Sequence, residues 1–401
     1  MSEDFIPYGR QLVDEDDVRA VSEVLRSPWL TTGPLVEQFE EALAARVGAR
    51  FCVVFSSGTA ALHGAYFAAG VGKGDEVITT PLTFAATANA ALYLGAKPIF
   101  VDIARDSFNI DVEKIEGALT PRSRVVAPVD MAGEPAELEK ISELARENGL
   151  VVVEDACHAL GALYKGKKVG SVSDMTVFSF HPVKHITTGE GGAVTTDNED
   201  YCRRLKAFRS HGMVREKDLF EGCLLEDEDT SGFWYYEQQL LGYNYRLSDI
   251  HCALGLSQLK KLDFFLKRRR EIAAKYHAAF CRHPLLMVPP QPAAHDSSDE
   301  TLNVASRTVS AWHLYILRLR GEKSDRRRVV ESLREMGIGT QVHYLPVYLH
   351  PYYRKLGYRP GLCPRAEDYY RRAFSIPIFP AMTDAEVERV IEGVLCAVEK
   401  L

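Results

Sequence analysis

The chain has 401 residues, which is too long for one ordinary hydrophobic core and predicts a large domain with a smaller one. Hydrophobic residues make up 46% of it and charged residues 26%, a composition that is typical of globular proteins and excludes a disordered chain. The formal net charge of −7 argues against nucleic acid or an anionic membrane as the partner.

The cysteines and the first residues indicate a cytoplasmic protein. The eight cysteines are scattered, without a CxxC pair or the spacing of metal ligands, so reduced thiols and no metal site are expected. The chain opens on the acidic segment Met1-Ser2-Glu3-Asp4, which does not resemble a signal peptide. No apolar stretch reaches transmembrane length. A reducing cytoplasm is the expected compartment.

From residue 51 to residue 196, β-branched runs alternate with segments of helical length. Strands are expected over 51–55, 76–80, 98–102, 124–129, 150–155, 175–180 and 193–196. Strands separated by helix-length segments predict a mainly parallel sheet with right-handed crossovers. The loops that carry function should then gather at the carboxyl ends of these strands.

The second half of the chain predicts a connection to a smaller domain. Residues 248–283 are expected to form one long helix that bridges towards this domain. Residues 284–303, rich in Pro, Ala, Ser and Asp, are expected to form an exposed loop, as is the acidic run 226–229. We therefore place a large domain, with the N-terminal segment, at 1–262 and a small C-terminal domain at 263–401.

The small domain is expected to be an α/β unit. Its elements, in chain order, are a strand over 312–320, a helix that Ser324 caps and that stops near Gly337, a strand around 341–344, and a terminal helix. Thr383 and Glu386 have the spacing of a capping box at the start of the terminal helix. The arginine runs 268–270 and 326–328 are expected to lie on solvated helix faces.

Lys184 follows the apolar run 175–180 and begins a polar, glycine-rich loop. A lysine beside apolar residues is unlike a solvated surface lysine, because partial burial lowers the pKa of its ammonium group. The neutral amine is the form that attacks a carbonyl group to give a Schiff base. This setting suits a lysine that carries pyridoxal phosphate (PLP), although the local motif alone fits a structural lysine equally well.

Two upstream segments offer what this cofactor needs. Asp155 ends a β-branched run and can keep the pyridine nitrogen protonated, so that the ring withdraws electrons from the substrate. Ser57, Gly58 and Thr59 form a turn that opens a helix, whose free N–H groups and dipole attract a phosphate, and Ser179 can add a hydroxyl. Taken singly, these residues could be helix caps. Their order and separation favour the cofactor.

Several motifs extend this pattern along the chain: Ser57-Gly58-Thr59-Ala60-Ala61-Leu62, Thr79-Thr80-Pro81-Leu82-Thr83-Phe84, Val153-Glu154-Asp155-Ala156-Cys157-His158, Ser179-Phe180-His181-Pro182-Val183-Lys184 and Gly242-Tyr243-Asn244-Tyr245-Arg246-Leu247. Together they resemble the DegT/DnrJ/EryC1 family of nucleotide-sugar aminotransferases, from Ile6 to the C-terminal helix. The resemblance implies an α/β protein with the aspartate-aminotransferase-like fold (fold type I) of PLP-dependent transferases. This fold has a mainly parallel sheet and a smaller C-terminal α/β domain.

The resemblance also implies roles for single residues. Lys184 would carry the cofactor covalently, and Asp155 would contact its pyridine nitrogen. Phe84 would lie over one face of the pyridine ring, with His158 near the other side. Asn244 would reach the cofactor phosphate of the neighbouring subunit, which implies a homodimer with composite active sites. Apart from the resemblance, Phe84 would be a core aromatic residue and Asn244 a turn former.

Further segments resemble the subgroup that acts in pseudaminic acid synthesis: Arg209-Ser210-His211-Gly212-Met213, Phe233-Trp234-Tyr235-Tyr236-Glu237, Ala253-Leu254-Gly255-Leu256-Ser257-Gln258-Leu259-Lys260-Lys261 and Gln341-Val342-His343-Tyr344. The subgroup implies L-glutamate as amino donor, 2-oxoglutarate as its product and a UDP-linked 4-keto-6-deoxy-N-acetylhexosamine as acceptor. Segments that line its sugar and nucleotide site match Tyr8, Pro28-Trp29-Leu30-Thr31 and Gln341-Val342-His343-Tyr344. Tyr8 and Trp29 are more often plain packing residues.

Two alternatives remain open at this point. The first is a transaminase for another nucleotide ketosugar, such as a 3-keto sugar or a bacillosamine-type 4-keto sugar. The second is a regulatory homologue without catalysis, which the complete set of Ser179, Lys184 and Asp155 argues against. Dehydratase relatives carry histidine in place of the lysine, so Lys184 favours transamination, although His185 is its neighbour.

Overall fold

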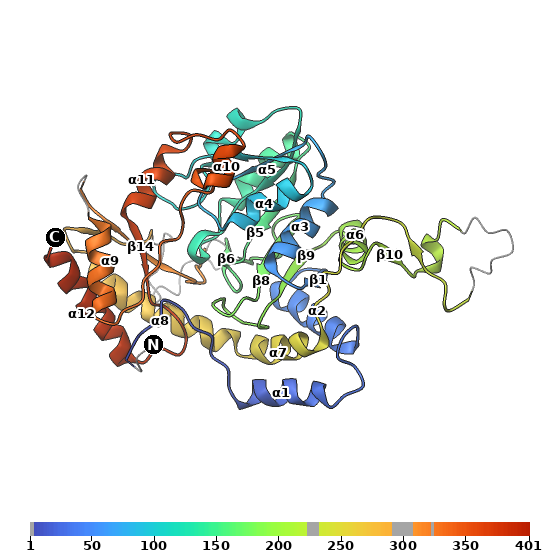
Figure 1. Cartoon of the computed structure of the whole chain (residues 1–401), viewed down its shortest axis with the longest axis horizontal. Helices are drawn as coiled ribbons and strands as arrows, with labels where there is room; N and C mark the ends of the chain where they lie inside the picture. The colour runs from blue at the N-terminus through green and yellow to red at the C-terminus, as the bar shows by residue number, and fades with distance from the viewer. Residues whose placement is uncertain (1–3, 223–231, 291–307, 322–324) are drawn as a thin grey trace.

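The β-branched runs form one seven-stranded sheet in the computed structural model, which describes residues 4–222, 232–290, 308–321 and 325–401. The strands are β1 (Phe51–Phe55), β2 (Glu76–Thr79), β3 (Lys97–Phe100), β4 (Ser123–Ala127), β5 (Val151–Asp155), β8 (Met175–Ser179) and β9 (Gly192–Thr196). Their order is β1-β9-β8-β5-β4-β2-β3, and β9 alone runs antiparallel to its neighbours. The prediction of a mainly parallel sheet is confirmed (Figure 1).

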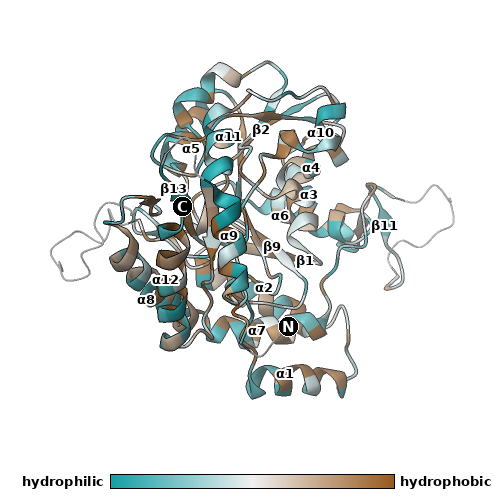
Figure 2. Cartoon of the chain, turned by 60° about the vertical axis from the view of Figure 1, so that its left-hand side comes forward, coloured by the Kyte–Doolittle hydropathy of each residue, from teal (hydrophilic) through white to brown (hydrophobic). Residues whose placement is uncertain are grey.

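Helices cover both faces of this sheet. One face packs against α3 (Gly58–Ala68), α4 (Ala85–Tyr93) and α6 (Glu199–Arg209), and the other against α2 (Pro34–Val47) and α5 (Leu138–Glu147). Strands buried on both faces need a nearly continuous apolar sequence, which is why these strands could be predicted from the sequence. Figure 2 shows hydrophobic strands inside layers of helices that turn hydrophilic sides outward. Within the described ranges, no helix is both long enough and apolar enough to span a bilayer.

A second, smaller unit follows in the chain. Its antiparallel sheet consists of β12 (Leu286–Met287), β13 (Tyr315–Leu319) and β14 (Ala373–Ile376). Its helices are α8 (Leu262–Phe280), α9 (Arg326–Glu335), α10 (Pro351–Lys355), α11 (Pro364–Arg372) and α12 (Asp384–Glu399). Ile6 from the N-terminal segment packs into the same hydrophobic cluster. The domain boundary at 262/263 stays a prediction.

The structure corrects the predicted connection between the two units. The expected helix over 248–283 is two helices, α7 (Asp249–Lys260) and α8, which part at Lys261. The helix α1 (Glu15–Leu25) packs on α7. Within the predicted loop 284–303, Leu286 and Met287 pair with β13 as a short strand, and residues 291–303 lie outside the described part.

The small unit differs from its prediction in two places. The segment 341–344 is not a strand, because Gln341 alone forms an isolated bridge, with Ser375, and the backbone then turns away. Ser324, the predicted helix cap, lies outside the described residues, and the side chain of Asp325 caps α9 instead. The predicted capping box of α12, between Thr383 and Glu386, is confirmed.

The predicted solvation of the arginine runs is confirmed in part, because Arg270, Arg327 and Arg328 are exposed and the other three are not. Arg269 is fully buried, Arg268 donates to the carbonyl of Met382, and Arg326 donates to the carbonyl of Tyr370. The reason is that α8 packs against the hydrophobic clusters of both units, whereas α9 packs on α12 and β14, so some of their faces meet protein where the sequence pattern indicated solvent.

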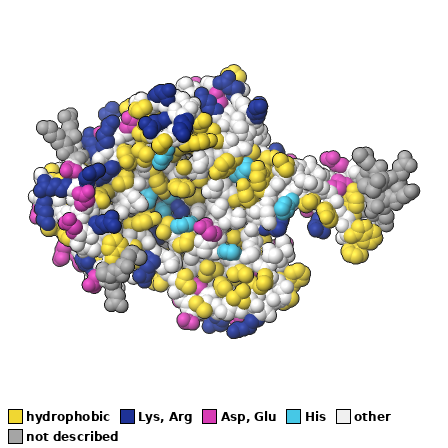
Figure 3. All heavy atoms as spheres, viewed as in Figure 1, with side chains coloured by type: hydrophobic (Ala, Val, Ile, Leu, Met, Phe, Trp, Pro, Cys, Tyr) yellow, Lys and Arg dark blue, Asp and Glu magenta, His cyan; other side chains and the backbone are white. Residues whose placement is uncertain are grey.

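An arm leaves the body beyond α6 and carries β10 (Met213–Val214) and β11 (Glu237–Gln238). Near its tip, Phe233 is 91% exposed and Trp234 and Tyr236 are exposed too. Figure 3 shows hydrophobic side chains gathered there. The acidic run 226–229, predicted to be a surface loop, lies outside the described residues. A small hairpin of β6 (Leu163–Tyr164) and β7 (Lys167–Lys168) completes the strands.

Candidate active site

The turn between β1 and α3 lies close to the ends of β8 and β9, and this region is called the cradle below. Ser57 is the N-cap of α3, and its hydroxyl accepts a hydrogen bond from Ala60 N at 3.1 Å. A Cβ atom on Gly192 would lie 2.6 Å from the backbone of Ser57, and one on Gly58 would lie 3.0 Å from Cβ of Ser179. These glycines therefore let the ends of β8 and β9 approach the helix N-terminus, where free N–H groups attract a phosphate.

Of the cradle residues predicted from sequence, Ser57, Gly58 and Ser179 thus lie together, and Thr59 is in the first turn of α3. The plainer interpretation of Ser57 as a helix cap is also correct, since its hydroxyl is engaged with Ala60 N. Its backbone and the first N–H groups of α3 remain the groups that an anion would meet.

Asp155 stands at the carboxyl end of β5 and is only 5% exposed. Its Oδ2 accepts a hydrogen bond from the Thr87 hydroxyl at 2.6 Å, and its Oδ1 accepts one from Cys157 N at 3.2 Å. The hydroxyl of Thr83 lies 2.6 Å from that of Thr87. The carboxylate is therefore held in one orientation by two donors. A group that is to contact a ring nitrogen needs such a fixed orientation.

Lys184 lies beyond the end of β8 and is partly buried. Burial lowers the pKa of its amine below the ordinary value, the nearby Cys157 and Asp155 oppose this shift, and the positive charge of Arg269 adds to it. The amine is therefore easier to deprotonate than that of a surface lysine, which is the property of a reactive lysine.

Three rings form one wall of the site. Tyr344 lies between Phe84 and His158, with its ring centroid 6.3 Å from each of theirs. The hydroxyl of Tyr344 is 3.3 Å from Nε2 of His158. Burial, and then the charge of Lys184, hold the pKa of His158 well below its usual range, so this imidazole is neutral. Phe84 is 63% exposed, which leaves its face free for a ring.

Tyr8 and His343 extend this wall. Their ring centroids are 5.5 Å apart, although they come from opposite ends of the chain. Nδ1 of His343 lies 2.8 Å from the hydroxyl of Ser375, and its carbonyl accepts a hydrogen bond from Tyr369 at 2.7 Å. Burial lowers the pKa of His343 to about 3. The structure thus brings together Tyr8, His343 and Tyr344, with Gln341 and Val342 beside them in the chain.

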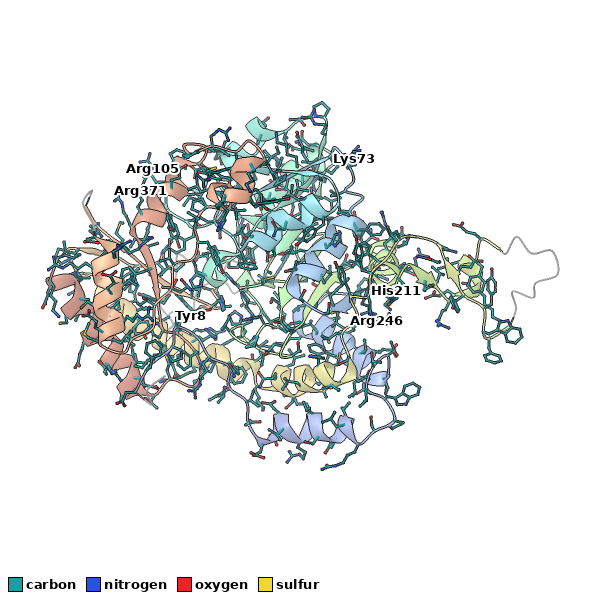
Figure 4. All side chains as sticks on the ribbon, in the orientation of Figure 1. Tyr8, Lys73, Arg105, His211, Arg246 and Arg371 are labelled. Carbon is teal, nitrogen blue, oxygen red and sulfur yellow. The ribbon has the colours of Figure 1, made fainter. Side chains whose placement is uncertain are left out.

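Two predicted segments lie elsewhere in this chain. Pro28, Trp29, Leu30 and Thr31 are exposed after α1, and Leu30 accepts a hydrogen bond from Asp249 N at the start of α7. Trp29 lines a cavity of about 680 Å³ between α1, α2 and α7. Asn244 is exposed and bridges to Ser210. In Figure 4, Tyr8 lies on one side of the body, and His211 and Arg246, which flank Asn244 in this region, lie on the other.

Sequence reasoning missed several residues that support the site. Thr87 orients Asp155, and its signal was a threonine on the buried face of an alanine-rich helix. The ring of His313 lies with its centroid 4.3 Å from that of His158, tilted by 36°, and no sequence motif indicated this contact. Among the residues that the structure describes, no group of three or more His, Cys, Asp or Glu side chains is arranged to hold a metal ion.

Comparison with known proteins agrees with this geometry. Residues 11–395 match the DegT/DnrJ/EryC1/StrS aminotransferase family. The spore coat polysaccharide biosynthesis protein SpsC of Bacillus subtilis is 42% identical over 394 residues, which cover 97% of this chain and 96% of that protein. The UDP-4-amino-4,6-dideoxy-N-acetyl-β-L-altrosamine transaminase of Campylobacter jejuni is 40% identical over 400 residues, 99% of this chain and 98% of that protein.

A solved structure agrees as well. Helicobacter pylori PseC, an aminotransferase involved in pseudaminic acid biosynthesis, matches with a TM-score of 0.87 and 34% identity over 99% of this chain and 100% of that one. The matches cover both the sheet that carries Lys184 and the small unit that carries His343. The chain therefore belongs to the DegT/DnrJ/EryC1/StrS aminotransferase family and is a PLP-dependent sugar aminotransferase.

Proposed function

We propose that this enzyme transfers the amino group of L-glutamate to a UDP-linked 4-keto-6-deoxy-N-acetylhexosamine. The product would be UDP-4-amino-4,6-dideoxy-N-acetyl-β-L-altrosamine, on the way to pseudaminic acid, with 2-oxoglutarate as the second product. The observation that carries the proposal is the position of Lys184 close to Asp155, beside the wall formed by Tyr8, His343 and Tyr344. The names of the Campylobacter relative and of PseC support the choice of sugar.

The residues of the site fit PLP. Asp155 offers a fixed carboxylate to a pyridinium nitrogen, and Phe84 offers an open aromatic face to the ring. The cradle at Ser57 and Gly58 suits the phosphate, because the free N–H groups at the N-terminus of α3 lie there and glycine at 58 and 192 allows β8 and β9 to approach them. When bound, PLP supplies an electron sink that draws electrons from the substrate carbon.

The role assigned to Lys184 is proton transfer as well as attachment. Once its Nζ is free, the neutral amine takes a proton from one carbon and returns it to another as general base and then general acid. The lowered pKa of Lys184 keeps a larger fraction of this amine neutral near neutral pH. Asp155 would present its carboxylate to the pyridine nitrogen, and Thr87 holds it in place.

The sugar would meet polar groups that are already oriented. His343 is neutral and engages Ser375 through Nδ1, which leaves its Nε2 to bond a hydroxyl or a phosphate oxygen. Tyr8 offers a ring face and a hydroxyl to the sugar. A site built on such contacts should reject an analogue that leaves its donors unpaired.

A panel of 4-keto nucleotide sugars tests the substrate. With L-glutamate as donor and mass spectrometry of the products, the specificity constant for the L-arabino 4-ketosugar should exceed that for the D-xylo epimer by at least about tenfold, as expected when one buried hydrogen-bonding group is left unpaired. His343→Ala should narrow this ratio. A preference for the D-xylo epimer would assign a bacillosamine-type substrate and leave the role of Lys184 intact.

Another nucleotide ketosugar is the second candidate. It is favoured by the match to SpsC, which is named for spore coat polysaccharide biosynthesis and is 42% identical over nearly the same length. The same panel decides between the two, provided that it includes 3-keto and dTDP-linked sugars. A regulatory protein without catalysis would form no amino sugar from any member of the panel.

A homodimer with composite sites belongs to the same proposal. The exposed aromatic side chains of the arm, including Phe233 and Trp234, support a partner surface, since large exposed apolar groups mark interaction sites. Asn244 is exposed in this chain and free to reach a second copy.

Mixing two weakened variants tests the composite site. Lys184→Ala and Asn244→Ala subunits should form heterodimers in which one site has both native residues, so activity should rise to about a quarter of wild type in an equimolar mixture, by random pairing with one restored site in half of the dimers. Mass spectrometry under native conditions confirms the heterodimers. If they form and activity does not rise, Asn244 acts within its own subunit.

A further inference from the structure

Arg269 is a buried cation that the proposed reaction does not use. It lies on α8 and is 1% exposed. Its Nη1 donates to the carbonyls of Trp312 at 3.2 Å, His313 at 3.2 Å and Ile378 at 2.9 Å. In the part of the chain that the structure describes, it forms no ion pair with a carboxylate, and its Nε has no hydrogen-bond partner.

These bonds hold a short segment next to the site. Trp312 and His313 precede β13, and Ile378 follows β14, so Arg269 ties neighbouring strand ends of the small sheet to α8. The backbone of His313 is also fixed on its other side, because His313 N donates to the carbonyl of Ala132 at 2.9 Å. The main chain of His313 is therefore clamped between the two units.

The side chain of His313 contacts two histidines of the site. Its ring centroid is 4.3 Å from that of His158 and 5.5 Å from that of His185. His158 in turn lies 3.3 Å from the hydroxyl of Tyr344. Arg269 is thus connected through His313 to His158, one of the three rings in the wall of the site.

Arg269 also lies near the reactive lysine, because it bonds the carbonyl of His313, whose ring lies 5.5 Å from that of His185, the chain neighbour of Lys184. Carbonyl dipoles solvate a guanidinium without cancelling its charge, and in a poorly hydrated interior that charge acts over a longer range than in water. It works with burial to lower the pKa of Lys184, whereas Cys157 and Asp155 oppose it. The other titratable groups facing Lys184 are His158, His185, His313 and His343, all with lowered pKa values.

We propose that Arg269 is a positioning residue that fixes His313 against His158 and maintains an uncompensated positive charge behind Lys184. The amine then stays available as a neutral nucleophile and base. The inference rests on the proposed role of Lys184 as the reactive lysine. A carboxylate partner for Arg269 would cancel the charge, which gives a physical reason for a buried arginine bonded to carbonyls alone.

Arg269→Met tests the charge. Methionine fills much of the volume and removes the charge, and it leaves three carbonyls without their donor, which lowers stability. Full-length protein freed of cofactor is labelled with an amine-reactive reagent at a series of pH values. Mass spectrometry then gives the labelling midpoint of Lys184, with exposed Lys167 as the reference in the same sample.

In wild type, the midpoint of Lys184 should lie below that of Lys167. In Arg269→Met it should rise by about one pH unit, as expected when one nearby unit charge is removed from a protein interior, while Lys167 does not move. A folded variant with an unchanged midpoint for Lys184, or a wild-type midpoint at or above that of Lys167, overturns the proposal.

Two further variants complete the experiment. Arg269→Gln removes the same charge but can still donate to a carbonyl, so it should give the same shift if the methionine variant does not fold. Arg268→Met is the matched control, because Arg268 also bonds a carbonyl of the small unit but is paired with Asp384 and Glu271. It should destabilise the fold and leave the midpoint of Lys184 in place, and an equal shift there contradicts the specific role of Arg269. Since labelling requires neither cofactor nor sugar, its outcome is independent of the substrate assignment.

Discussion

Replacing Lys184 with alanine is expected to lower the rate of transamination by about 10²–10⁴-fold, the usual contribution of a positioned general acid or base. The variant loses the amine that moves the proton, while the cradle at Ser57 and the carboxylate of Asp155 remain. The measurement is the single-turnover rate with saturating donor. Lys167→Ala, on the exposed hairpin strand β7, is the matched control and should turn over like wild type.

The same residue should be the point of attachment. Borohydride reduction of the purified enzyme followed by peptide mapping should place the pyridoxyl group on Lys184. The assignment would be contradicted if the pyridoxyl group were found on Lys165, Lys167 or Lys168. Full turnover by Lys184→Ala would contradict it as well.

Asp155→Asn should bind the cofactor and lose about ten- to hundredfold in turnover. The amide is nearly isosteric and can keep the contacts to Thr87 and Cys157 N, but it carries no charge to stabilise a protonated pyridine nitrogen. Loss of one charge-assisted hydrogen bond costs roughly 1.5–3 kcal/mol, which converts to this factor. Cofactor content is measured by absorbance, and turnover by product formation.

The control for this substitution is Asp174→Asn. Asp174 accepts a hydrogen bond from Val152 N near the opposite end of the same strand pair, so its loss should affect stability and leave turnover of the folded enzyme unchanged. Wild-type turnover in a cofactor-loaded Asp155→Asn enzyme would remove Asp155 from its assigned role.

The cofactor half of the site was largely predictable because it follows from strand ends. Parallel strands buried on both faces have continuous apolar runs, so their ends were placed within two residues, and the polar residues just beyond them had to meet at one edge of the sheet. Ser57, Asp155 and Lys184 were found in this way.

The rest depended on contacts between distant segments. The burial of Arg269 arises where α8 meets Trp312, His313 and Ile378, and helical periodicity does not reveal which face a second unit will cover. The break at Lys261 lies between two strong helix-forming runs without a proline or glycine to mark it. Trp29 was predicted to line the sugar site through the resemblance alone. Within one chain it lies beside α7, away from the other predicted sugar-site residues.

The contact between Tyr8 and His343 has a consequence for how the enzyme matures. The residues assigned to the cofactor, apart from Asn244, lie between positions 57 and 184, whereas the proposed sugar wall joins the eighth residue to one more than 330 positions later. Because chains emerge from the ribosome N-terminus first and domains fold as units, the cofactor half can assemble while the C-terminal unit is still being made. Until that unit is complete, Tyr8 lacks its contact with His343, and a nascent chain would acquire its cradle and the carboxylate of Asp155 before it acquired any means to select a sugar.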